Sequence, residues 1–133
     1  PWEFHLEGIL GNNGDQVNTN REGDFWAIVV MPSFWIIEDS LEAVFRYQYQ
    51  GSNEIEGIRL NSRYIRRAGA RDGFSSLANG RGDEHHSFYL GLNKLINSHQ
   101  QKIMAGVEYD TLLQNGNGLF GGWSAFAAYR MYW

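Results

Sequence analysis

Arginine residues are concentrated in one stretch of this sequence. Six of the eleven Lys and Arg residues lie between Gly57 and Gly82, where Asp72 is the only acidic residue. They are Arg59, Arg63, Arg66, Arg67, Arg71 and Arg81. A guanidinium group is always charged, and its fork of N–H donors fits carboxylate and phosphate groups. The chemistry expected of this cluster is therefore the attraction of small anions.

The other titratable residues do not follow the spacing of an enzyme or a metal site. His85 and His86 are adjacent, so on a strand their side chains point to opposite faces and cannot readily share a metal ion. Glu3 and Glu7 share a face but lie about 13 Å apart on an extended strand, too far for a catalytic carboxylate pair. We therefore expect neither enzyme activity nor a cofactor, with a membrane hydrolase kept only as a minor alternative.

The segments that carry these residues alternate with a period of two, which is typical of β-strands. From Leu41 to Gln50, one face carries Leu, Ala, Phe and Tyr, and the other carries Glu, Val, Arg and Gln. Similar alternation predicts six strands and no helix. The strands are expected over residues 2–11, 24–37, 41–50, 84–96, 101–112 and 120–133. In the second strand both faces are apolar and Pro32 interrupts the pattern, so we expect a β-bulge there.

The connections between the predicted strands alternate between short and long. Only residues 38–40 and 97–100 separate strands at one end, whereas residues 11–23, 51–83 and 113–118 connect them at the other. An up-and-down sheet with tight turns at one end and long loops at the other has this pattern. Outer-membrane β-barrels share it.

The composition is compatible with a β-type membrane segment and excludes a helical one. The 133 residues allow one domain or part of one, with 43% hydrophobic and 20% charged residues. No apolar run reaches about 18 residues, but a barrel strand needs only about 9–11. Only two Lys occur, which is few for the outer faces of a soluble β-domain. The net charge of −4 gives no global reason to expect nucleic acid.

These observations predict an all-β fold, an up-and-down antiparallel transmembrane β-barrel segment in the bacterial outer membrane. Trp133 ends the apolar face of the last strand, so residues of the opposite parity are expected to face the lumen. This lumen set comprises Glu3, His5, Glu7, Glu42, Arg46, Gln48, His85, Lys102, Glu108, Asp110 and Arg130. Mixed charges on such a wall would give weak ion selectivity, and simple pairing of acids with bases is the plainer interpretation for any one residue.

The C-terminal residues Tyr129, Met131 and Trp133 resemble the signature that the barrel-assembly machinery reads in Gram-negative outer-membrane proteins. Several blocks also resemble, in order, the C-terminal part of the phosphate-selective porin O and P family. The blocks are Asp24–Trp26, Met31–Trp35, Phe45–Tyr49, Leu60–Arg67, Gly82–His86, Tyr89–Asn93 and Met104–Tyr109. The resemblance extends over about residues 2–133.

This resemblance implies a water-filled barrel of roughly sixteen strands, commonly a homotrimer, that passes small anions or other small solutes. Barrels of a single chain begin at about eight strands, so residues 1–133 are expected to be the C-terminal portion of a longer porin. Any signal peptide is expected to have been removed or to lie upstream of Pro1. The implied partners are the lipid bilayer, lipopolysaccharide and the barrel-assembly machinery, with no cofactor and no nucleic acid.

The functional hypothesis is passive diffusion of small hydrophilic solutes with a bias toward anions, phosphate-like anions among them. The candidate anion-attracting residues are Arg46, Arg59, Arg63, Arg66, Arg67, Arg71 and Arg130. The loop over residues 51–83 could form a vestibule, or stay outside and bind lipopolysaccharide phosphates or a neighbouring subunit. Two other functions stay open: a non-conducting structural or adhesive outer-membrane barrel, and a soluble β-barrel that binds a small apolar ligand.

Overall fold

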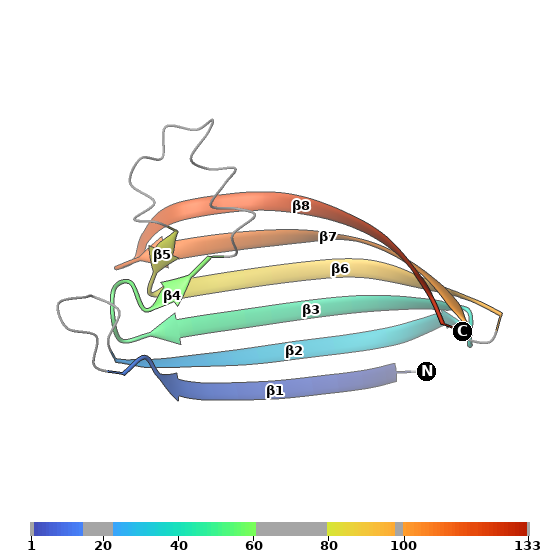
Figure 1. The fold of residues 1–133 in the computed structure, drawn as a ribbon, viewed down its shortest axis with the longest axis horizontal. Helices are drawn as coiled ribbons and strands as arrows, with labels where there is room; N and C mark the ends of the chain where they lie inside the picture. The colour runs from blue at the N-terminus through green and yellow to red at the C-terminus, as the bar shows by residue number, and fades with distance from the viewer. Residues whose placement is uncertain (1, 15–22, 61–79, 98–99, 133) are drawn as a thin grey trace.

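The computed structural model of the protein describes residues 2–14, 23–60, 80–97 and 100–132. These residues form an all-β structure built around one six-stranded antiparallel sheet (Figure 1). Its strands, in order across the sheet, are β1 (Trp2–Asn12), β2 (Asp24–Ile37), β3 (Leu41–Ser52), β6 (Glu84–Ile96), β7 (Gln101–Gln114) and β8 (Asn117–Met131). Because β1 and β8 form the two edges, the sheet made by the described residues is an open meander. None of these residues belongs to a helix long and apolar enough to cross a membrane.

The six strands predicted from the period-two pattern are confirmed, with ends that differ by a few residues. The two short connections are also confirmed at one end of the sheet, where β1 begins and β8 ends (Figure 1). Asp39 and Asn97 take φ values of 55° and 52° in these turns. Asp and Asn tolerate this left-handed region better than most residues, which explains their use in tight turns.

The prediction of a long connection at residues 113–118 is wrong. β7 continues to Gln114 and β8 begins at Asn117, so only Asn115 and Gly116 form the turn. Both have positive φ, at 50° and 77°, as the central residues of a type I′ hairpin require. The pairing register shifts between Leu112, which pairs with Phe120, and Leu113, which pairs with Gly118. β8 therefore has one extra residue beside the turn.

The predicted bulge at Pro32 is also wrong. The register of β2 against β3 is the same at Val30–Tyr47 and at Ser33–Val44, so the sheet passes Pro32 without an extra residue. Pro32 also keeps its place opposite Phe4 on β1. A proline removes one N–H donor from the ladder but does not by itself change the residue count. The irregularity lies between Trp35 and Ile37, beside the short turn.

The segment predicted as one loop, residues 51–83, contains two short strands. β4 (Ile58–Arg59) and β5 (Arg81–Gly82) pair with each other as a second, two-stranded sheet. We call this sheet, together with Leu60, the inner hairpin. Leu60 is 2% exposed and packs with Leu112 of β7, which is fully buried. The inner hairpin is therefore held against one face of the main sheet by an apolar contact.

The pairing register divides the main sheet into two faces of opposite character. The face that includes Phe4, Leu90 and Trp123, here the apolar face, exposes these side chains by 68%, 58% and 66%. The face that includes Glu108 and Asp110, here the polar face, exposes them by 5% and 3%. Leu112 belongs to the polar face, so the inner hairpin covers that side.

The turn between β7 and β8 allows a test of the backbone argument. Gly116 has a φ of 77°, in the left-handed region, whereas the φ of Gly118 lies outside that region. A Cβ atom added at either position would meet no other atom within 4 Å. We expect Gly116→Ala to lower the free energy of unfolding by about 1 kcal/mol, because an L-residue is strained in the left-handed region. Urea-induced unfolding checks this, with Gly118→Ala as the matched control. Equal losses in the two variants would contradict the assignment.

Candidate functional site

The candidate site is the charged cluster at the centre of the polar face, where β3, β6 and β7 lie side by side. All eleven residues of the predicted lumen set lie on this face, as the pairing register requires. The parity assigned from the sequence is thus confirmed. The face itself is covered partly by the inner hairpin, which sequence reasoning left open.

Arg46 and Glu108 form the strongest ion pair of the cluster. Arg46 Nη2 donates a hydrogen bond of 2.7 Å to Glu108 Oε2 across β6. The Glu108 carboxylate is almost fully buried, and this guanidinium contributes to the compensation of its charge. Arg46 also lies over the ring of Tyr89, 5.3 Å from its centroid. The cation is therefore held by a carboxylate and by an aromatic face.

His85 forms a second polar group one step nearer the inner hairpin. Its Nε2 lies 2.9 Å from Asp110 Oδ1, and its Nδ1 lies 3.1 Å from Gln50 Oε1. Asp110 and His85 are both buried. The adjacent His86 points to the apolar face, where it contacts Tyr47 and Glu84. The two histidines therefore lie in different environments, as their adjacency predicted.

A cavity of about 440 Å³ opens over this cluster. Its walls carry two cationic, two acidic and several neutral polar side chains: Arg46, Gln48, Gln50, Arg59, His85, Ser87, Glu108 and Asp110. Hydroxyl, amide, carboxylate and guanidinium groups can all contact a solute there. Such a lining suits a small hydrophilic molecule and its water.

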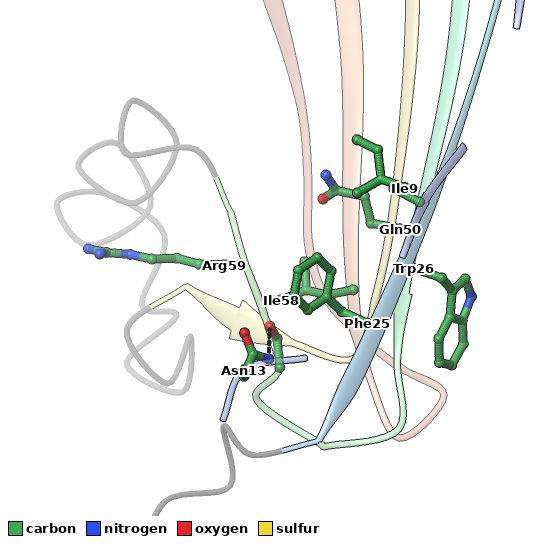
Figure 2. Close-up of a pocket in the computed structure, with 9 residues that line it drawn as sticks. Ile9, Asn13, Phe25, Trp26, Gln50, Ile58 and Arg59 are labelled. Carbon is green, nitrogen blue, oxygen red and sulfur yellow. Dashed lines mark hydrogen bonds between the residues drawn. The ribbon is translucent and has the colours of Figure 1, made fainter. Parts of the chain in front are cut away.

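The inner hairpin borders a second, smaller cavity of about 230 Å³. Figure 2 shows Ile9, Phe25 and Gln50 on the same side of the main sheet as the hairpin, with Ile58 next to Phe25, whereas Trp26 lies on the opposite side. Asn13 Nδ2 donates a hydrogen bond of 3.4 Å to Gly57 O, which ties the end of β1 to the hairpin.

Five of the predicted anion-attracting arginines lie in the loop, and the structure describes one of these five, Arg59. It borders both cavities, and Figure 2 shows its guanidinium directed away from the main sheet. Arg63, Arg66, Arg67 and Arg71 lie outside the described residues.

The last predicted cation and the assembly residues lie at the other end of the sheet. Arg130 is exposed, opposite Lys102 on the polar face, and lies 5.0 Å from the centroid of the Tyr132 ring. It is therefore separate from the central cluster. Tyr129 and Met131 are exposed on the apolar face, and Trp133 lies outside the described residues.

Sequence reasoning missed the aromatic side of this site. Tyr89 and Phe126 face the lumen set from β6 and β8, with ring centroids 6.4 Å apart. The available signal was the pair of isolated glycines, Gly91 and Gly106, since a glycine inside a strand indicates a close approach by another group.

Comparison with known proteins found no matching family model, no matching curated protein and no matching solved structure.

The Arg46–Glu108 pair provides a test of the cluster's energetics. We expect Arg46→Ala to lower the free energy of unfolding by about 2 kcal/mol, because it removes the guanidinium that is hydrogen-bonded to a buried carboxylate. Arg130→Ala is the matched control, since this arginine is exposed on the same face; its loss should stay below about 0.5 kcal/mol. Urea-induced unfolding measures both, and equal losses would contradict the central role of the pair.

Proposed function

We propose that this chain forms part of the wall of an outer-membrane β-barrel porin, through which small hydrophilic solutes diffuse with a preference for anions. In this proposal the polar face lines a water-filled lumen and the apolar face contacts lipid. The barrel-assembly machinery would recognise Tyr129, Met131 and Trp133, and lipopolysaccharide and two further subunits would be neighbours of the complete barrel.

The observation that carries this proposal is the inversion of the two faces. In a protein surrounded by water, the covered face of a sheet is the apolar one and the exposed face is polar. Here the buried positions hold Glu108, Asp110 and His85, while Phe4, Leu90 and Trp123 are exposed. A barrel in lipid requires this distribution, with apolar side chains outward and polar side chains inward.

The height of the apolar face supports the same proposal. Its charged strand residues lie only near its ends: Asp24 and Glu84 toward the inner hairpin, and Lys94 beside the short turns. The ten residue steps from Glu84 to Lys94 span about 34 Å along the strand, or about 26 Å when the strand is tilted by about 40°. This value agrees with the apolar band of about 25 Å in outer-membrane barrels.

The open edges of the sheet indicate how the barrel would close. Among the described residues β1 and β8 each pair on one side only, and an unpaired backbone edge is not tolerated in lipid. Further strands must therefore satisfy both edges. The expected source is the rest of a longer barrel, of which these six strands form one sector.

The inner hairpin supports the anion preference. Leu60 and Leu112 hold it against the polar face, so the arginine-rich segment begins and ends over the proposed lumen. Arg59 borders the same cavity as Arg46. Arginines at a constriction lower the barrier to entry of anions.

The experiment that tests this function is conductance in a planar bilayer. We expect the whole protein that carries this chain to give stepwise currents, and a zero-current potential of anion-selective sign under a salt gradient. Folded, heat-modifiable protein that gives no current would contradict the porin proposal. It would favour the alternative, a non-conducting structural or adhesive barrel.

The loop arginines are tested in the same apparatus. Combined replacement of Arg59, Arg63, Arg66 and Arg67 by Gln should move the zero-current potential toward cation selectivity, because fixed positive charge at the entrance is lost. The control is Lys94→Gln, which removes a positive charge from the apolar face and should leave the potential unchanged. A potential that does not move after the fourfold replacement would assign the anion preference to another part of the lumen.

The orientation of the faces is tested by placing a lysine on each. Leu90→Lys should lower the free energy of unfolding in lipid by about 2–4 kcal/mol, since it puts a cation near the middle of the lipid-facing band. Gln48→Lys on the same sheet should cost far less, because the lumen is wet. Reversible urea unfolding in lipid vesicles measures both changes. A Leu90→Lys variant as stable as wild type would contradict lipid contact.

A further inference from the structure

Tyr89 lies across the surface of the polar face instead of standing away from it. Gly91 lies two residues after Tyr89 on β6, and Gly106 on β7 pairs directly with Gly91. A Cβ atom at either glycine would overlap the phenol ring of Tyr89. The ring therefore lies over both backbones, and the two glycines together provide the space that it occupies.

Two neighbouring groups complete an aromatic and cationic floor. The Phe126 ring is 6.4 Å from the Tyr89 ring at an interplanar angle of 58°, and the Arg46 guanidinium lies 5.3 Å from the Tyr89 centroid. With Met104 and Ala128 they line a cavity of about 280 Å³. A flat ring flanked by a second aromatic side chain offers apolar area at little conformational cost.

This aromatic cavity adjoins the polar cavity of the candidate site. The two share Arg46 and Glu108 in their walls. Gln48 and Ser87, which line the polar cavity, add neutral hydrogen-bonding groups. A solute placed across both would meet an apolar surface on one side and donors and acceptors on the other, which is the general composition of a small-molecule site.

Arg46, the cation that the two cavities share, is already paired, which selects against a free anion as the preferred ligand. Arg46 is bonded to Glu108 at 2.7 Å, and His85 lies 2.9 Å from Asp110. A free anion would have to compete with the Glu108 carboxylate for the Arg46 guanidinium. A neutral ligand can instead add hydrogen bonds to both members of a pair without separating them.

We propose that the polar face carries a subsite for a neutral, ring-shaped polar solute, a pyranose sugar, whose C–H face stacks on Tyr89 and whose hydroxyl groups bond to Arg46 and Glu108. The subsite rests on the proposed function, because a sugar reaches it only through a water-filled lumen. Where Tyr89 lies, the subsite gives the proposed pore a preference for sugars. This preference is distinct from the attraction of anions by the loop.

The test measures the reduction of the ion current through the whole protein in a planar bilayer as D-glucose is added. Sorbitol is the matched control solute, since it is neutral and of similar size but has no ring. We expect glucose to reduce the current saturably, and sorbitol to reduce it only in proportion to concentration.

Variants connect this readout to the aromatic floor. Tyr89→Leu and Gly106→Ala should raise the half-saturating glucose concentration about fivefold to tenfold, because the first removes the ring and the second displaces it. Tyr89→Phe should keep the wild-type value, since it keeps the ring. Phe88→Leu, on the apolar face of the same strand, is the control and should also keep it.

Four results separate this inference from the function on which it rests. Saturable glucose block that Tyr89→Leu weakens and Phe88→Leu does not would support the subsite. Normal conductance with the same unsaturated response to glucose and sorbitol would overturn the subsite and leave the porin proposal intact. Block by inorganic phosphate alone, weakened by Tyr89→Leu, would overturn it in favour of an anion site. Absence of any conductance would overturn both proposals.

Discussion

The rest of the structure depends on one constraint, the strict alternation of side chains along six antiparallel strands. A residue on a strand can face only one of two sides, and direct cross-strand pairing carries that choice from one strand to the next. Apart from the shifts at Trp35/Ile37 and Leu112/Leu113 the register keeps this order, so one face is mainly aromatic and aliphatic and the other collects most of the acids, amides and arginines. A slip of one residue in any pair would mix the faces and leave charges such as Glu108 on the apolar side.

The second element of the design is a small apolar contact on the polar face. Leu60 and Leu112, with Leu119 and Phe120 packed against them, are the buried hydrophobic cluster of the described residues. The contact positions the inner hairpin beside Arg46, His85 and Asp110. β4 and β5 thereby lie over the side of the sheet that holds the charges. The contact between Leu60 and Leu112 thus holds the inner hairpin on the polar face.

The charged cluster and the aromatic floor are two parts of one surface. The Arg46–Glu108 bond neutralises a buried carboxylate, and the same guanidinium covers part of Tyr89. Gly91 and Gly106 allow the Tyr89 ring to lie flat over the strand backbones. The polar face therefore combines mixed charge, hydrogen-bonding groups and a flat ring within a short length of β3, β6 and β7. This combination is the structural basis of the pore and the subsite proposed above.

The sequence by itself determined the six long strands, their order as a meander and, outside residues 24–37, the face of each side chain. A period of two and short turns are local properties that need no distant partner. It misplaced the β7–β8 connection, where Asn115 and Gly116 make a tighter turn than the glycine-rich stretch suggested, and it placed a bulge at Pro32, where the ladder loses a donor but keeps its register. Only the tertiary structure decided the direction of the inner hairpin, the pairing of Arg46 with Glu108 and the low position of Tyr89. Each of these depends on residues that are far apart in the chain, such as Leu60 with Leu112, and their contact follows from packing, which no local pattern records.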